Sequence, residues 1–127
     1  MSDPVNPIDV FGKFLMENLR DKAIACCDSL SCERSGVPRL IHLEDDLRSL
    51  NDEHLCILKR CIVEAVDVAI HSFLFQVHEY AEQENAVQVC VNGVNVAHLS
   101  DGLHGELFGK DGWMAQYSEY GESPEIA

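Results

Sequence analysis

The chain has 127 residues, of which 46% are hydrophobic and 24% are charged, and its formal net charge at pH 7 is -13. This length suits one domain with a core of its own, and this composition argues against global disorder. We therefore expect a single domain over residues 1–127, with a frayed tail from about residue 121. The negative charge disfavours nucleic acid and anionic membrane surfaces as partners.

A long helix is predicted over residues 7–32. Asn6 can accept hydrogen bonds from free backbone amides, and Pro7 suits the first helical position. Apolar side chains then recur at three- and four-residue steps and form one stripe: Ile8, Phe11, Leu15, Leu19, Ala23, Cys26 or Cys27, and Leu30. Gly36 and Pro38 follow the stripe and end the helix, because proline cannot continue helical hydrogen bonding.

Two more helices are predicted after this break. Leucines spaced around an acidic run predict a short amphipathic helix over residues 39–50. The central helix begins with Ser49 or Asn51 as its N-cap and continues to about Gln83. Its apolar stripe contains Leu55, Leu58, Ile62, Val66, Ala69, Phe73 and Val77, and six further apolar residues widen that stripe. A helix this apolar is expected to be covered on more than one side, by the first helix, by a sheet or by another subunit.

The pattern changes to that of a β-hairpin in the C-terminal part. Valines alternate with polar residues over 87–91, Asn92-Gly93 supplies a two-residue turn, and the alternation returns over 94–98. Residues 103–108 and 113–117 predict a third and a fourth strand. The fold class expected is therefore α+β, with two or three N-terminal helices packed on a small C-terminal antiparallel β-meander.

The cysteines and histidines do not predict a metal or catalytic site. The six cysteines include no C-x-x-C pair, and neighbouring residues such as Cys26 and Cys27 point about 100° apart on a helix. The six histidines include no H-E-x-x-H motif. We therefore predict no catalytic residue, no cofactor and no metal, and a protein that is not an enzyme.

The N-terminal residues indicate a cytoplasmic location. MSDPVNPIDVF lacks the basic region and the continuous apolar run of a secretory signal. Charged residues such as Lys59, Glu64 and Asp67 interrupt the most apolar region, which therefore lacks the roughly 18 uninterrupted apolar residues of a membrane span. Cysteines in this compartment are expected to be reduced.

Acidic and aromatic residues mark the C-terminal part as a binding surface. Residues 61–127 hold 11 acidic side chains and a single basic one, Lys110. Such asymmetry steers a basic partner to one face, although acidity also serves solubility alone. The residues predicted to contact a protein partner are Asp101, Glu106, Asp111, Glu119, Tyr120 and Glu122. Trp113 is expected in the core rather than in this surface.

In size, charge and its acidic, aromatic C-terminal part, the chain resembles the immunity proteins of bacterial polymorphic toxin and contact-dependent inhibition systems. The resemblance implies a cytoplasmic inhibitor that binds a basic toxin domain, often a nuclease, and blocks its active site. The carboxylates could then occupy the positions of substrate phosphates.

Two alternatives come from other classes of protein. An acidic secretion chaperone would act as a homodimer through the broad apolar face of the central helix. A small enzyme with dispersed catalytic residues would need a deep polar pocket, with Cys90, His98 or His104 as candidate residues.

Overall fold

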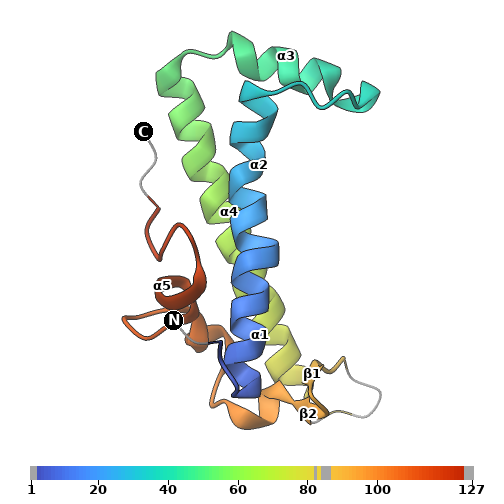
Figure 1. The fold of residues 1–127 in the computed structure, drawn as a ribbon, viewed down its shortest axis with the longest axis vertical. Helices are drawn as coiled ribbons and strands as arrows, with labels where there is room; N and C mark the ends of the chain where they lie inside the picture. The colour runs from blue at the N-terminus through green and yellow to red at the C-terminus, as the bar shows by residue number, and fades with distance from the viewer. Residues whose placement is uncertain (1–2, 82, 84–86, 125–127) are drawn as a thin grey trace.

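The computed structural model describes residues 3–81, 83 and 87–124. Two long helical rods lie side by side and antiparallel, and the C-terminal residues pack around one end of them (Figure 1). The first rod consists of α1 (Pro7–Leu15), a π-helical turn (Met16–Arg20) and α2 (Asp21–Cys32), and the second rod is α4 (Asp52–Tyr80). A 3-10 turn (Pro38–Leu40) and α3 (Ile41–Ser49) connect the rods at the other end.

The three predicted helices are confirmed, and the first and the central helix start at the predicted caps. The Asn6 side chain accepts a hydrogen bond from the Ile8 backbone N–H at 3.1 Å, and Asn51 accepts one from His54 at 2.8 Å. The central helix ends at Tyr80, before its predicted end at about Gln83. Residue 82, between these two positions, lies outside the described residues.

The buried stripe of the first rod changes direction at the π-helical turn. A π turn holds more residues than an α turn, so it rotates the side chains that follow it around the helix axis. Phe11 and Leu15 are buried as predicted, but Leu19 is 47% exposed. Arg20, the last residue of the turn, is buried, and the buried positions beyond the turn are Ile24 and Cys27. The predicted stripe is therefore wrong at Leu19, and it omits Arg20.

The buried stripe of α4 also differs from the predicted one. Its buried residues are Val63, Ile70, Leu74 and Val77, whereas Phe73 of the predicted stripe is 42% exposed. Helix α4 is therefore buried along one narrow side, and much of the apolar surface expected to be covered is open.

The predicted α+β fold is wrong, because the described chain is mostly helical. A two-stranded antiparallel hairpin is present, with β1 (Cys90–Val91) paired to β2 (Val94–Asn95) in the predicted register of Val91 opposite Val94. Asn92 and Gly93 have φ values of 52° and 80°, the left-handed backbone that this turn requires. After the hairpin the described chain forms 3-10 turns at Val96–Leu99 and Leu103–Leu107, and then α5 (Trp113–Tyr117).

Local hydrogen bonds explain why the predicted β-meander does not form. The Asn95 side chain accepts from the Ala97 backbone N–H at 3.1 Å, which starts a 3-10 turn where the strand was expected to continue. Farther along, the Gln116 backbone N–H donates to the Gly112 carbonyl at 3.0 Å and begins α5 in place of the fourth strand. The consecutive residues Trp113 and Met114 are both buried, which an alternating strand does not allow.

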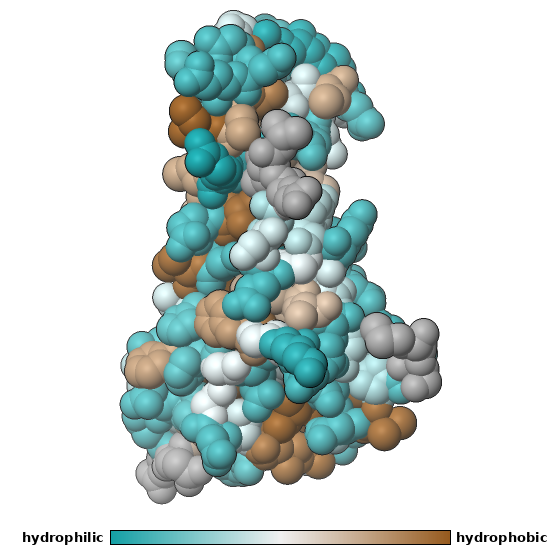
Figure 2. Space-filling view, turned by 90° about the vertical axis from the view of Figure 1, so that its left-hand side faces the viewer, coloured by the Kyte–Doolittle hydropathy of each residue, from teal (hydrophilic) through white to brown (hydrophobic). Residues whose placement is uncertain are grey.

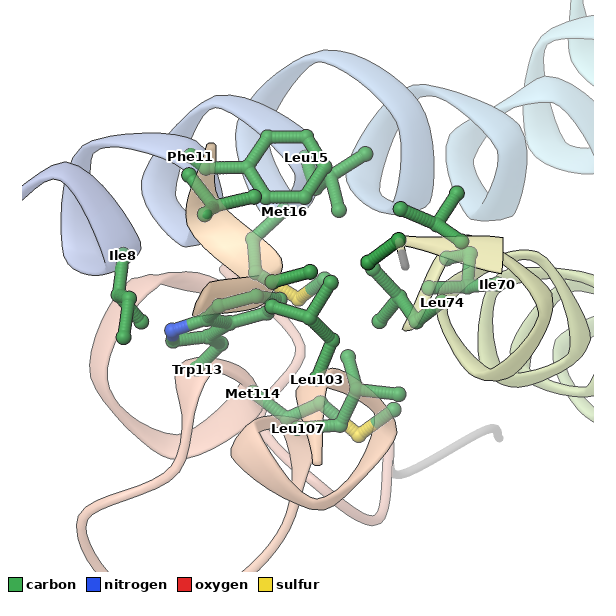
Figure 3. Packing of buried hydrophobic residues seen from close by; sticks show 14 residues of the cluster. Ile8, Phe11, Leu15, Met16, Ile70, Leu74, Leu103, Leu107, Trp113 and Met114 are labelled. Atoms are coloured by element: carbon green, nitrogen blue, oxygen red, sulfur yellow. The ribbon is translucent and has the colours of Figure 1, made fainter. Parts of the chain in front are cut away.

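The core lies where both rods meet the C-terminal residues, as Figure 3 shows. Trp113 is 1% exposed, which confirms its predicted place in the core, and its ring meets that of Phe11 edge-to-face with centroids 5.8 Å apart. Gly12 allows this approach, because a Cβ there would lie 2.3 Å from the Trp113 ring. The C-terminal residues are therefore part of the same core as the helices.

Candidate partner-binding site

A cleft of about 330 Å³ lies between α4 and residues 108–123, of which we call residues 118–123 the C-terminal segment. Its lining residues combine carboxylates with apolar and aromatic side chains: Glu64, Asp67, Val68, His71, Phe108, Met114, Glu122 and Ser123. We call this the acidic cleft. Glu64 and Glu122 are exposed carboxylates of this lining, one from the helix and one from the segment.

A buried arginine fastens the C-terminal segment beside the acidic cleft. Arg20 is fully buried, and its guanidinium donates to both Asp67 carboxylate oxygens, at 2.7 and 3.1 Å. The same group donates to the Ser118 hydroxyl at 2.8 Å and to the Gly121 carbonyl. Because these partners come from α4 and from the segment, Arg20 links both walls of the cleft.

Asp21, the next residue along the helix, adds two more bonds to this link. It accepts from the Ser118 hydroxyl at 2.6 Å and from the Glu119 backbone N–H at 2.9 Å. Residues 118–121 are therefore held by neighbouring side chains of the first rod. We call Arg20, Asp21, Asp67 and Ser118 the polar clamp.

Three of the predicted partner-binding residues lie on this fastened segment. Glu122 lines the acidic cleft and accepts from the Gly109 backbone N–H at 3.3 Å. Glu119 is exposed, whereas Tyr120 is half-buried, and burial raises the pKa of its phenol, with Glu119, Asp28 and Asp21 adding to the effect. The frayed tail expected from about residue 121 falls partly outside the described residues, at 125–127.

The other three predicted residues do not line the cleft. Asp101 is exposed in the loop before the 3-10 turn Leu103–Leu107, and Glu106 of that turn accepts from the Ser100 hydroxyl at 2.9 Å. Asp111 is exposed in the turn that precedes α5. These three residues therefore lie outside the acidic cleft, among the C-terminal residues that pack around one end of the rods.

Sequence reasoning missed Glu64, Asp67 and His71. These residues are spaced three and four apart on α4, which places polar side chains on one side of an otherwise apolar helix. That spacing was the signal available, but it was interpreted only as an interruption of the apolar run. Their meeting with Glu122 depends on the path of the C-terminal segment, which the spacing does not reveal.

Rings form one wall of the acidic cleft and extend beyond it. The ring centroids of His71 and Phe108 are 6.2 Å apart, and those of His71 and His104 are 5.1 Å apart. The ring centroids of Phe75 and His104 are 5.2 Å apart. Ring faces beside carboxylates favour a cationic side chain, by attraction to both the π system and the charge.

The electrostatics of the cleft are those of a binding site for a cation. Asp67 is already paired with Arg20, so Glu64 and Glu122 supply the uncompensated negative charge. Among residues 3–81, 83 and 87–124, no group of three or more His, Cys, Asp and Glu side chains could hold a metal ion. Aromatic rings beside exposed carboxylates are a combination that suits a cationic side chain such as lysine or arginine.

Comparisons with models of known protein families, with curated proteins and with solved structures found no match. The geometry and charge of the acidic cleft therefore carry the functional inference.

Proposed function

We propose that this chain is a cytoplasmic protein-binding inhibitor of the immunity type, which neutralises a basic, nuclease-like toxin domain by blocking its active site. The observation that carries the proposal is the acidic cleft, in which two uncompensated carboxylates flank an aromatic wall. A lysine or arginine of the toxin inserts between Glu64 and Glu122 and lies against Phe108. The net charge of -13 steers the basic partner toward the chain.

The polar clamp gives this binding its affinity. A surface that is ordered before binding loses less conformational entropy when the partner docks. Arg20 and Asp21 hold the segment that carries Glu119 and Glu122, so these carboxylates are already in place. Once docked, they occupy positions that the phosphates of a nucleic acid substrate would otherwise take.

The test compares two double charge reversals of equal net change. Glu64→Lys with Glu122→Lys alters the acidic cleft, and Asp101→Lys with Asp111→Lys alters the exposed loops outside it. The tagged wild-type chain first captures its partner from the source cell's lysate, at about 0.05 and 0.5 M salt, which differ strongly in screening. Dissociation of the captured partner is then measured for each variant by surface plasmon resonance.

Both variants should slow association, because both reduce the steering charge. Only the cleft variant should accelerate dissociation, with affinity roughly 30-fold weaker or more, since losing a paired charge costs about 2–5 kcal/mol. Equal dissociation rates would reject the cleft as the binding site. Capture of no basic protein, or of one whose nuclease activity survives an equimolar amount of the chain, would reject the inhibitor.

A second candidate function, an acidic secretion chaperone, is favoured by the open apolar side of α4. The same capture experiment separates it from the inhibitor. A chaperone would recover several unfolded effectors, and reversing Glu64 and Glu122 would leave their capture intact.

A further inference from the structure

An apolar groove lies between the two rods, away from the acidic cleft. It encloses about 490 Å³ and is lined by hydrophobic side chains of both rods: Phe11, Phe14, Leu15, Leu19, Ala23, Val66, Ala69, Ile70 and Phe73. A second hollow, which shares Phe73, continues the apolar lining toward Val77, Tyr80 and Val87. The groove exists because the π-helical turn directs Leu19 outward and Arg20 inward.

The rims of this groove carry large exposed apolar side chains. Phe14 is 60% exposed, Leu19 47% and Phe73 42%. Figure 2 shows hydrophobic surface on one face of the molecule, along one edge of its narrow upper part and again near its lower end. Apolar side chains grouped around one groove mark an interaction site, since apolar surface costs free energy to hydrate.

Helix α4 exposes more apolar surface than is usual for a helix of its composition. By length and hydropathy it could cross a membrane, with a mean hydropathy of 1.3 over its most apolar 18 residues, yet only 22% of that window is buried. A core helix of a water-soluble protein with this composition is covered on most sides. The groove side of α4 therefore needs a cover from outside the chain.

The distribution of charged residues indicates which partner can cover the groove side of α4. Between residues 61 and 78, α4 carries only two Asp or Glu residues and no Lys or Arg, and both acids, Glu64 and Asp67, line the acidic cleft instead of the groove. On the α1 rim, Lys13 is paired with Asp3 at 2.6 Å and with Glu17 at 3.7 Å. A chain with a net charge of -13 repels its own copy through almost any other face, whereas the groove offers contact without opposed carboxylates.

We propose that the groove is a homodimer interface, occupied by the same groove of a second copy of this chain. Under a two-fold axis the patch meets itself, so the protruding Phe14 and Phe73 of each copy enter the hollow of the other. Ala23 and Ala69 on the groove walls leave room for this approach. A basic partner is drawn to the acidic cleft, so the groove and the cleft serve different partners.

The available area suits a dimer that dissociates in the micromolar range. The α4 residues that line the groove and its continuation, 66–80, span about 21 Å at 1.5 Å per residue, and two adjacent helices are about 20 Å wide, which gives an area of the order of 400 Å². Stable interfaces bury about 800 Å² on each partner. The groove and its continuation therefore supply about half of that area, which is typical of a weak dimer.

The test is the molar mass of the full chain in solution, measured by sedimentation equilibrium from about 1 to 100 μM, a range chosen around micromolar affinities. The wild type should approach twice the 14.2 kDa of one chain. Ala69→Asp places a carboxylate in the groove and should give the monomer, with at least 100-fold weaker association. Ala69 is exposed, so this variant should keep the fold, which circular dichroism checks.

Ile57→Asp is the matched control. Ile57 is 48% exposed on the same helix, outside the groove, and the substitution adds the same charge. This variant should stay dimeric. A monomeric wild type, a dimer that persists in Ala69→Asp, or equal weakening of the dimer by both substitutions would overturn the proposal. Binding of the wild type to vesicles of phosphatidylcholine that Ala69→Asp abolishes would overturn it in favour of a membrane surface.

Discussion

Residues 7–80 and residues 87–124 differ in what holds them in place. The first region forms long helices whose hydrogen bonds are internal and whose starts are capped by Asn6 and Asn51. The second region has four described residues in strands, two 3-10 turns, the five-residue helix α5 and otherwise irregular segments. It nevertheless contains several completely buried side chains, including Val96, Leu103, Leu107 and Trp113, each 0–1% exposed.

The difference teaches that the C-terminal region depends on the helices for its shape. Its short turns supply few internal hydrogen bonds, so burial against the rods and the polar clamp must fix its path. The helices, in contrast, leave much of their apolar surface open. Damage to contacts between the regions should therefore release the C-terminal residues before it melts the rods.

The substitution expected to show this dependence with the largest effect is Trp113→Ala. Removing this ring from the site beside Phe11 and Gly12 should lower the free energy of unfolding by about 3–5 kcal/mol, the usual cost of truncating a buried aromatic side chain. Urea denaturation followed by circular dichroism measures the loss. Limited proteolysis should find new cleavage within 87–124 while the helical signal persists.

Trp113→Phe separates packing from the indole N–H. Trp113 Nε1 is buried and has no hydrogen-bond partner among the described residues, so phenylalanine removes an unsatisfied donor together with some volume. This variant should lose less stability than Trp113→Ala. If Trp113→Ala instead melts the rods and the C-terminal region in one step, the two regions form a single cooperative unit and the proposed order of release is wrong.

A smaller effect is expected when the polar clamp is broken by Arg20→Met. The variant leaves Asp67 without its partner in a largely buried place and should cost about 3 kcal/mol. Cleavage should appear near residues 118–121, which the clamp holds. Stability is again measured by urea denaturation.

Two controls show whether the unpaired charge is the cause. Arg20→Met with Asp67→Leu removes both charges and should recover most of the loss. Lys13→Met breaks an exposed ion pair of the same helix and should leave stability and cleavage unchanged. A loss in the double variant as large as in Arg20→Met would assign the effect to packing.

The helices could be predicted from the sequence because caps and periodicity are local signals. The C-terminal turns could not. Leu103 and Leu107 have helical spacing, but Gly105 between them lowers helix propensity, and only burial against α4 decides the outcome. The alternation after Gly93 correctly predicted a hairpin, yet it could not show that the Asn95 side chain would end the strand.

The acidic cleft was predictable only in part. Glu122 was identified from composition, but its meeting with Glu64 requires the path of the segment that Arg20 fixes. Arg20 is buried because the π-helical turn rotates it inward, and a regular 3.6-residue period places Leu19 there instead. A single irregular turn thus decides the cleft and the groove together.

The smallest effect concerns how the two regions respond to alkali. In the rods, burial raises the pKa of the Cys27 thiol above its ordinary value of 9.0, against the opposing charge of Lys59. In the C-terminal region, burial raises the pKa values of Tyr117 and Tyr120 above 10.0. In each case the folded state keeps a proton that the unfolded state releases, so stability falls with rising pH.

The order of the two losses follows from the ordinary pKa values. The contribution of Cys27 is complete below pH 9.0 and begins to fall above it, whereas the contributions of the tyrosines begin to fall only above pH 10.0. Urea denaturation from pH 8 to 10 should therefore show a falling stability that Cys27→Ala flattens. Cys26→Ala should keep the wild-type slope, because Cys26 is exposed on the same helix. If Cys27→Ala keeps that slope as well, the early alkaline loss does not arise between the rods, and groups of the C-terminal region must titrate first.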